Sequence, residues 1–79
     1  MTGSIPEYHA FTPAALDALE GAVRDGRRVA LRRRGTEYVV VAERLDSEGR
    51  DDVLWGRLPM TGEALAFRLR ELERFAILP

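Results

Sequence analysis

The sequence contains no cysteine and no lysine, and His9 is its single histidine. Without cysteine the chain can form neither disulfides nor thiolate zinc sites. No apolar run approaches the ~18 residues that a membrane helix needs, so we expect no membrane-spanning segment. The first residues also lack the basic and apolar regions of a secretory signal. We therefore expect a cytoplasmic protein.

Residues that commonly carry catalysis are scarce as well. His9 stands in a segment without periodicity, and the sequence holds no Gly-rich phosphate loop, no HExxH motif and no nucleophile elbow. Asp51 and Asp52 are adjacent, but they follow Gly49 in a stretch that is typical of a turn. Scattered acids and one histidine lack the spacing of metal ligands. We predict no enzymatic activity, no catalytic residue, no cofactor and no metal site.

With 79 residues the chain is expected to form one domain. A domain of this size hides only about 60 to 65% of its unfolded surface, so every apolar stretch is needed for the core. We divide the chain into an arm (residues 1–11), a helix (12–26) and a β-barrel (27–79). Ile5, Tyr8 and Phe11 are the residues of the arm that can attach it to the body.

Residues 12–26 carry the signals of a capped helix. The Thr12 hydroxyl can accept from the first N–H groups, Pro13 fits the first turn, and Phe11 can pack on Leu16. Gly26 is the expected residue after the last turn. The apolar stripe consists of Ala15, Leu16, Leu19, Ala22 and Val23.

Residues 28–43 contain two β-rich runs separated by a turn. Val29 and Leu31 occupy alternate positions of the first run, as in a strand with one buried face. Residues 38–42 are apolar at five successive positions, which is typical of a strand covered on both faces, so we place this strand at the centre of the sheet. Gly35 takes positive φ without steric cost. We predict a hairpin closed by Arg34, Gly35 and Thr36.

Residues 53–60 resume a strand pattern after a polar turn at 45–52. Pro59 cannot donate to a ladder, so it marks the end of this strand or a sheet edge. One side of the strand is expected to carry Leu54, Gly56, Leu58 and Met60, and the other Val53, Trp55 and Arg57.

The tail, residues 63–76, fits two interpretations. With a period of 3.6 its leucines form one stripe of a helix, and with a period of 2 residues 65, 67 and 69 point inward along a strand. The helix would place Phe67 about 160° or more from Leu65 and Leu69. We favour the strand, followed by a tight turn at 70–74 and a last strand at 75–78, because it buries Phe67.

The charges are unevenly distributed. All 12 basic residues are arginines, and six of them fall in residues 24–34, whereas residues 43–52 are mostly acidic. Arginine suits bidentate contacts to carboxylate or phosphate. The two blocks can therefore pair internally, pair between subunits or bind outside partners, and we favour pairing.

If the basic block binds a partner, the candidate residues are Arg27, Arg28, Arg32, Arg33 and Arg34. Alternation along the strand sends Arg32 and Arg34 to one face and Arg33 to the other. The cluster is then an arginine rim and not a flat stripe. Such a rim contacts few phosphates, so we predict that any nucleic-acid binding is weak and steeply salt-sensitive.

The order of arm, helix, Gly26, hairpin and further strands resembles the Sm-like version of the SH3-type small barrel. Within that class the chain resembles the Rof (YaeO) family of small Rho-binding antiterminators. The resemblance is carried by three stretches: Tyr8 leading into a helix with Leu16, Leu19, Glu20 and Ala22; Glu37-Tyr38-Val39-Val40-Val41; and Gly62-Glu63 followed by Phe67-Arg68-Leu69, Leu72 and Phe75. The closing pattern is also similar to WYL-type barrels, which sense nucleic-acid ligands.

The resemblance implies an α+β fold, with an N-terminal helix followed by a small, mainly antiparallel five-stranded Sm-like barrel. It further implies a Rho-like protein partner, with Asp17 and Glu20 as the acidic residues that match. Rof-like proteins are markedly acidic, however, whereas here the helix is followed by six arginines.

We therefore predict a non-enzymatic regulatory binding module that occupies a protein surface, in transcription regulation if the family's role applies. The alternatives are a nucleic-acid-binding barrel that uses the arginine rim and a self-assembling structural subunit. An open strand edge beside opposite charge blocks predicts a homo-oligomer at micromolar concentration.

Overall fold

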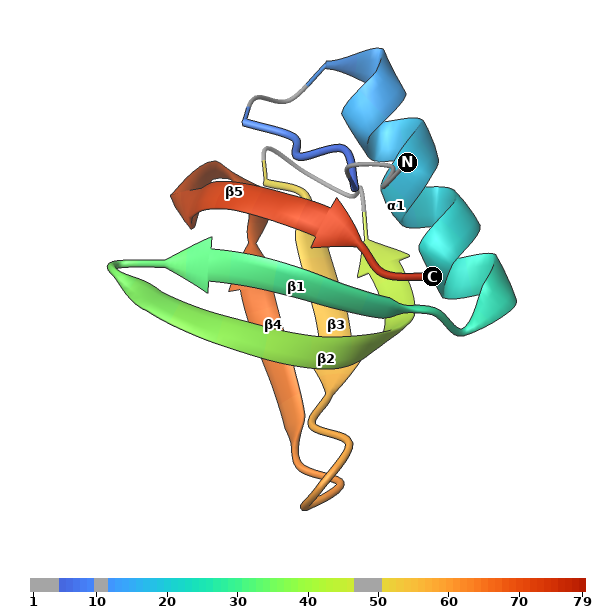
Figure 1. Cartoon of the computed structure of the whole chain (residues 1–79), viewed down its shortest axis with the longest axis vertical. Coiled ribbons are helices and arrows are strands. Elements are labelled where there is room, and N and C mark those ends of the chain that lie inside the picture. The colour runs from blue at the N-terminus through green and yellow to red at the C-terminus, as the bar shows by residue number, and fades with distance from the viewer. Residues whose placement is uncertain (1–4, 10–11, 47–50) are drawn as a thin grey trace.

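The computed structural model describes residues 5–9, 12–46 and 51–79. One helix, α1 (Pro13–Asp25), precedes the strands β1 (Arg28–Arg33), β2 (Thr36–Asp46), β3 (Val53–Arg57), β4 (Ala64–Arg68) and β5 (Leu72–Ile77), with a 3-10 turn, η1 (Leu69–Glu71), before the last strand (Figure 1). The strands form one antiparallel sheet in the order β4-β3-β2-β1-β5. The predicted α+β class, a helix followed by five antiparallel strands, is confirmed. The sheet is not closed, because β4 and β5 remain its two edges.

The helix forms where its local signals place it. Thr12 Oγ1 accepts from the backbone N–H of Ala15 at 3.1 Å, and Gly26 ends the helix with φ of 65°. Both caps confirm the sequence prediction. The expected contact of Phe11 lies outside the described residues. The face of α1 that the sheet covers consists of Ala15, Leu19 and Ala22.

β1 and β2 form the predicted hairpin, with a tighter turn than expected. Thr36 pairs with Arg33, which leaves Arg34 and Gly35 as a two-residue turn. Their φ angles are 51° and 76°, and positive values at both central residues are the mark of a type I′ turn. The predicted three-residue loop was therefore one residue too long.

β2 lies at the centre of the sheet, as predicted, but it is not covered on both faces. Val40 and Ala42 are buried, whereas Val39 is 42% exposed. The run of apolar residues thus serves the core on one face only. On its other face, β2 exposes the apolar side chain of Val39 to solvent.

The tail folds as strands and not as a helix. Phe67 and Leu69 are buried in the core, and η1 turns the chain into β5, which pairs with β1. Met60 does not continue the expected row of Leu54, Gly56 and Leu58, because β3 ends at Arg57 and Met60 is 95% exposed in the loop before β4. The largest fully buried side chains are Phe67, Leu19, Leu54, Leu69, Val29 and Val40.

The arm is attached to β5 at one of its expected residues. Tyr8 exchanges two backbone hydrogen bonds with Phe75, at 2.8 and 3.0 Å, and the two rings stack at 5.0 Å. Ile5 is 43% exposed and does not serve as an anchor. Within the described ranges, no helix has the length and apolar character to cross a membrane.

Candidate binding surfaces

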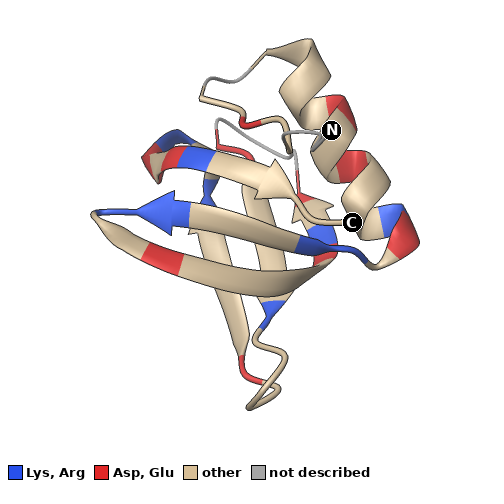
Figure 2. Cartoon of the chain, in the orientation of Figure 1, with Lys and Arg blue, Asp and Glu red and all other residues tan. Residues whose placement is uncertain are grey.

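The candidate arginines lie at the two ends of β1. Arg27 and Arg28 are exposed where the chain enters β1, and the others lie at the far end of the hairpin. Figure 2 shows basic residues at both ends of β1 with uncharged residues between them. The predicted rim is therefore only partly assembled. Arg32 lies on the outer face of the sheet, Arg33 lies on the inner face, and Arg34 lies at the tip of the turn.

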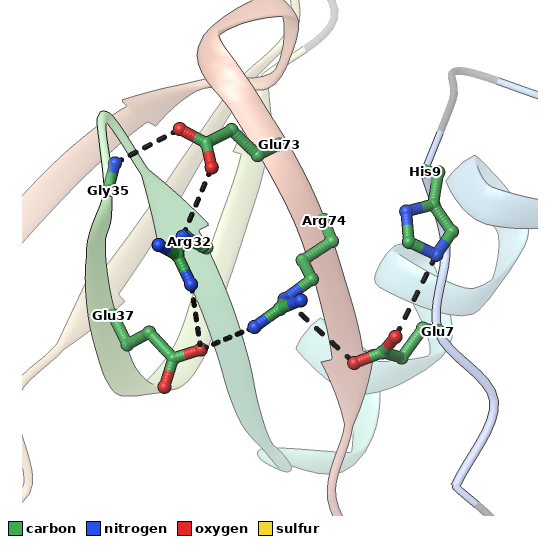
Figure 3. A network of polar contacts seen from close by, with 7 residues as sticks. All are labelled: Glu7, His9, Arg32, Gly35, Glu37, Glu73 and Arg74. Carbon is green, nitrogen blue, oxygen red and sulfur yellow. Dashed lines mark hydrogen bonds and ion pairs between the residues drawn. The ribbon is translucent and has the colours of Figure 1, made fainter.

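Arg32 belongs to a charge ladder across the outer face, formed by Glu7, Arg32, Glu37, Glu73 and Arg74 (Figure 3). Arg32 Nε lies 3.1 Å from Glu73 Oε1, and Arg32 Nη1 lies 3.9 Å from Glu37 Oε1. Arg74 Nη2 donates to Glu37 Oε1 at 2.9 Å and Arg74 Nε lies 3.9 Å from Glu7. Arg32 is thus paired with two acids of its own chain, while its side chain stays 37% exposed.

Hydrogen bonding and charge within the ladder change the protonation of Glu37. The bond from Arg74 holds the pKa of Glu37 below its ordinary value of 4.5, and the charges of Arg74 and Arg32 act in the same direction. Glu73 completes the ladder at the turn, where its Oε2 accepts from the Gly35 N–H at 3.0 Å. The ladder thereby ties β5 to the hairpin tip.

Arg33 and Arg34 line an open cleft of about 540 Å³, which we call the Arg/Trp cleft. It lies between the hairpin tip and the outer face of β3 and β4. Three arginines stand there against one glutamate, so the cleft attracts anions. Its lining consists of Arg33, Arg34, Val53, Trp55, Ala66, Arg68 and Glu71.

Arg33 closes the inner end of this cleft. Its guanidinium carbon lies 4.8 Å from the centre of the Phe67 ring and 5.3 Å from that of Tyr38. Its Nη1 donates to the Ala66 carbonyl at 3.4 Å and its Nη2 to the Tyr38 hydroxyl at 3.5 Å. Arg33 therefore covers the end of the core by cation–π contacts and also touches the edge of β4.

Trp55 forms the aromatic wall of the cleft, and a bulge brings Arg44 over it. The register of β2 against β3 shifts between Ala42 and Arg44, with Glu43 as the extra residue. Arg44 therefore pairs with Trp55 on the outer face, where its guanidinium lies 5.3 Å from the ring centre. Without this bulge, alternation would turn Arg44 toward the core.

The edge of β4 beside the cleft presents backbone groups to an added strand. Glu63 accepts from the Leu58 N–H, so the hydrogen-bonded pairs with β3 are those of Leu65 and Phe67. Ala64, Ala66 and Arg68 consequently direct their N–H and C=O groups away from β3. Within the described ranges, no strand pairs with this edge, and the Ala66 carbonyl accepts from the Arg33 side chain instead. Their side chains are also exposed, and those of Ala64 and Ala66 are too short to shield the edge.

Arg34 occupies an unfavourable backbone conformation at the rim of the cleft. Its φ of 51° lies in the left-handed region, where a residue with a Cβ costs roughly 1 to 2 kcal/mol. Asn or Gly is the usual residue at this turn position. The Arg34 side chain is 78% exposed, and its Nη2 lies 3.7 Å from Glu71 Oε2. Residues in strained backbone conformations cluster at functional sites, which makes Arg34 a candidate binding residue.

The predicted acidic candidates lie apart from the cleft. Asp17 and Glu20 are exposed on α1 and are not brought together with the arginines. Three described acids of residues 43–52 pair with arginines outside the basic block or within their own segment: Glu43 with Arg57, Asp46 with Arg44 and Asp51 with Arg70. None of these three pairs joins the acidic segment to the basic block. In the described part of the chain, no group of three candidate ligands could hold a metal ion.

No protein-family model, curated protein or solved structure matches this chain. The site is therefore defined by its geometry alone. The sequence analysis named Arg33 and Arg34 as candidate binding residues. It did not predict that Arg68, Glu71 and Arg44 lie near them. One signal was present, because placing Phe67 in the core by alternation turns Arg68 to the outer face. The pairing of Val53 with Arg68, which completes the cleft, needs the register of β3 against β4.

Proposed function

We propose that this protein is a non-enzymatic binding module that holds an extended acidic segment of a partner protein in the Arg/Trp cleft. One observation carries the proposal: a strand edge with outward backbone groups borders a cleft lined by three arginines. An added strand bonds to the backbone groups of the edge. Its acidic side chains meet guanidinium groups, which bind carboxylates through two parallel hydrogen bonds. The resemblance to the Rof family adds a role in transcription regulation to this proposal.

The backbone groups at the edge of β4 favour protein over nucleic acid as the partner. A peptide offers the backbone donors and acceptors that this edge requires. The phosphate oxygens of a nucleic acid can accept hydrogen bonds from the N–H groups of this edge. They offer no donor to the carbonyl groups of the edge.

Trp55 supports single-stranded nucleic acid as a second candidate ligand. An indole ring beside several arginines can stack a base while guanidinium groups contact phosphates. Three arginines would contact about two to four phosphates, so the affinity would fall with salt at a slope of roughly -0.7 for each phosphate. For this candidate we expect no binding tighter than about micromolar at physiological salt.

The single tryptophan permits a direct test, because its fluorescence reports on this cleft alone. We would titrate the protein with a peptide of alternating Glu and Val, with a peptide of alternating Lys and Val, and with 12-nucleotide oligo(U) and oligo(dT). The acidic peptide is expected to change the emission of Trp55 in a saturable way. The double variant Arg34→Ala/Arg68→Ala removes two charged hydrogen bonds to the peptide. It is expected to weaken the affinity for the acidic peptide by about tenfold or more.

Two further variants separate the parts of the site. Ala66→Pro removes an outward N–H but none of the bonds to β3, so it is expected to block strand addition and leave the sheet paired. Asp17→Asn with Glu20→Gln removes the acids that the Rof resemblance selects, and it is expected to leave the titration unchanged. Nanomolar, salt-tolerant oligonucleotide binding that the arginine variant loses would overturn the proposal in favour of nucleic acid. Absence of any change at Trp55 would overturn both.

A further inference from the structure

The outer face of β2, β1 and β5 carries an apolar row at its middle, which we call the outer row. It consists of Val39, Ala30 and Ala76, which are neighbours across the three strands. In a sheet with one solvated face, that face normally carries polar residues. Here Val39 is 42% exposed, and the short side chains of the two alanines leave a hollow of about 80 Å³ beside it.

Charged and apolar residues flank the outer row on its two sides. On one side stand Arg74, Arg32 and Glu37 of the ladder, and the hollow is rimmed by Arg74, Glu37 and Glu7. On the other side Arg28 pairs with Val41, and its carbonyl accepts from the Leu78 N–H at 2.8 Å. Figure 1 shows this face turned toward the viewer, with α1 at its side and β3 and β4 behind it.

We propose that the outer row is a self-association surface, and that its occupant is the outer row of a second copy of this chain. The surface is self-complementary about a two-fold axis that runs along β1 in the plane between two copies. Such an axis keeps Ala30 over Ala30 and exchanges the positions of β2 and β5. The projecting Val39 of each copy then meets the hollow beside Ala76 of the other.

The same axis matches the rows on either side. Glu37 of one copy lies over Arg74 of the other, so the two intramolecular pairs, each 2.9 Å long, join into one alternating network. Val41 likewise lies over Leu78. The axis also places Arg32 over Arg32 and Arg28 over Arg28, and each Arg32 is paired with Glu37 and Glu73 of its own copy. An axis along the row itself would instead place Val39 on Val39. The fit of Val39 to the hollow therefore selects the axis along β1, with the two sheets face to face as in aligned sheet packing.

The size of the surface sets the strength of the dimer. Three strands at ~4.8 Å spacing and three rows at ~6.6 Å spacing give a contact smaller than the ~800 Å² per partner of a standard interface. We therefore expect a weak, reversible dimer with a dissociation constant of about 10 to 100 µM, since small interfaces belong to transient complexes. The dimer leaves the Arg/Trp cleft open, because the cleft lies on the outer face of β3 and β4.

Sedimentation equilibrium from 10 µM to 1 mM tests the proposal on the full chain. Wild type is expected to show a monomer–dimer equilibrium. Val39→Lys replaces the projecting side chain by a charge, and Ala76→Arg fills the hollow; each is expected to weaken the dimer by about 30-fold or more. Met60→Lys makes a similar change at an apolar residue that is 95% exposed in the β3–β4 loop, and it is expected to leave the dimer unchanged.

Amide NMR spectra recorded on dilution locate the interface independently of the variants. Shifts are expected on β2, β1 and β5, centred on the outer row. A wild-type protein that stays monomeric at 1 mM would overturn the proposal. Association that persists in Val39→Lys but disappears in Ala66→Pro would overturn it as well, because it would assign self-association to the edge of β4.

Discussion

At the scale of single residues, Arg34 shows that binding and stability make different demands on the hairpin turn. Its φ of 51° is a conformation that Asn adopts at lower cost, and its only described ion pair joins a 78% exposed side chain to Glu71. An exposed pair of this kind contributes at most about 1 kcal/mol. The turn would thus be more stable without arginine, while the cleft would lose one of its cations.

We therefore expect Arg34→Asn to raise the free energy of unfolding by about 0.5 to 1 kcal/mol, since it relieves a left-handed Arg in a type I′ turn. The same variant is expected to weaken the binding of the acidic Glu/Val peptide several-fold. Urea denaturation and the Trp55 titration measure the two effects. Arg68→Ala serves as the comparison, with weaker binding and no gain in stability. A more stable Arg34→Asn protein with unchanged affinity would contradict a role for this side chain in binding.

At the scale of elements, the sequence predicts those parts whose signals are local. The helix followed from Thr12, Pro13 and Gly26, and the tail strand followed from the position of Phe67, because each signal acts within a few residues. The bulge at Glu43 was not predicted, since it depends on the register of β2 against β3. The exposure of Val39 was missed for a similar reason. An apolar run shows that a strand is central, but it does not show what covers its second face.

Gly56 illustrates an element contact that only the packed sheet shows. A Cβ at Gly56 would lie 2.5 Å from Cγ2 and 2.8 Å from Cβ of Val40, so β3 can approach β2 this closely only with glycine. We expect Gly56→Ala to lower the free energy of unfolding by about 1 to 3 kcal/mol, the usual cost of overpacking a core. Thermal and urea denaturation measure the change.

The same substitution in the helix is the matched control for Gly56. A Cβ at Gly21 meets only the flexible end of Arg24 at 3.4 Å, and alanine is the better helix former. Gly21→Ala is therefore expected to raise the free energy of unfolding by about 0.5 to 1 kcal/mol. If both variants shifted the stability in the same direction, the close approach of β2 and β3 would not be the cause.

At the scale of the whole molecule, the arrangement of charge could not be predicted from the sequence, because the partners are far apart along the chain. From the sequence, we favoured ion pairing between residues 24–34 and residues 43–52. In the fold, Arg32 instead meets Glu37 and Glu73, and Arg34 meets Glu71. These acids reach the hairpin because β5 returns to pair with β1. The cleft depends on the same long-range pairing, so only its two hairpin residues were named in advance.

This charge arrangement leads to a specific dependence of stability on pH. Hydrogen bonds from Arg74 and Arg57 hold the pKa values of Glu37 and Glu43, respectively, below the ordinary 4.5. The folded protein therefore binds protons at these groups less readily than the unfolded chain does, so stability rises with pH through this range. Their contribution is fully present above pH 4.5 and is lost as the pH falls through the lower folded-state values.

Wild type is thus expected to exceed Glu37→Gln/Glu43→Gln in unfolding free energy at pH 7, and the difference is expected to shrink steadily toward pH 3. Urea denaturation at a series of pH values, repeated in 1 M NaCl, provides the measurement, and high salt is expected to reduce the difference at pH 7 because both pairs are exposed. A difference that stayed constant from pH 7 to pH 3 would show that the two ion pairs do not stabilise the fold through their charge.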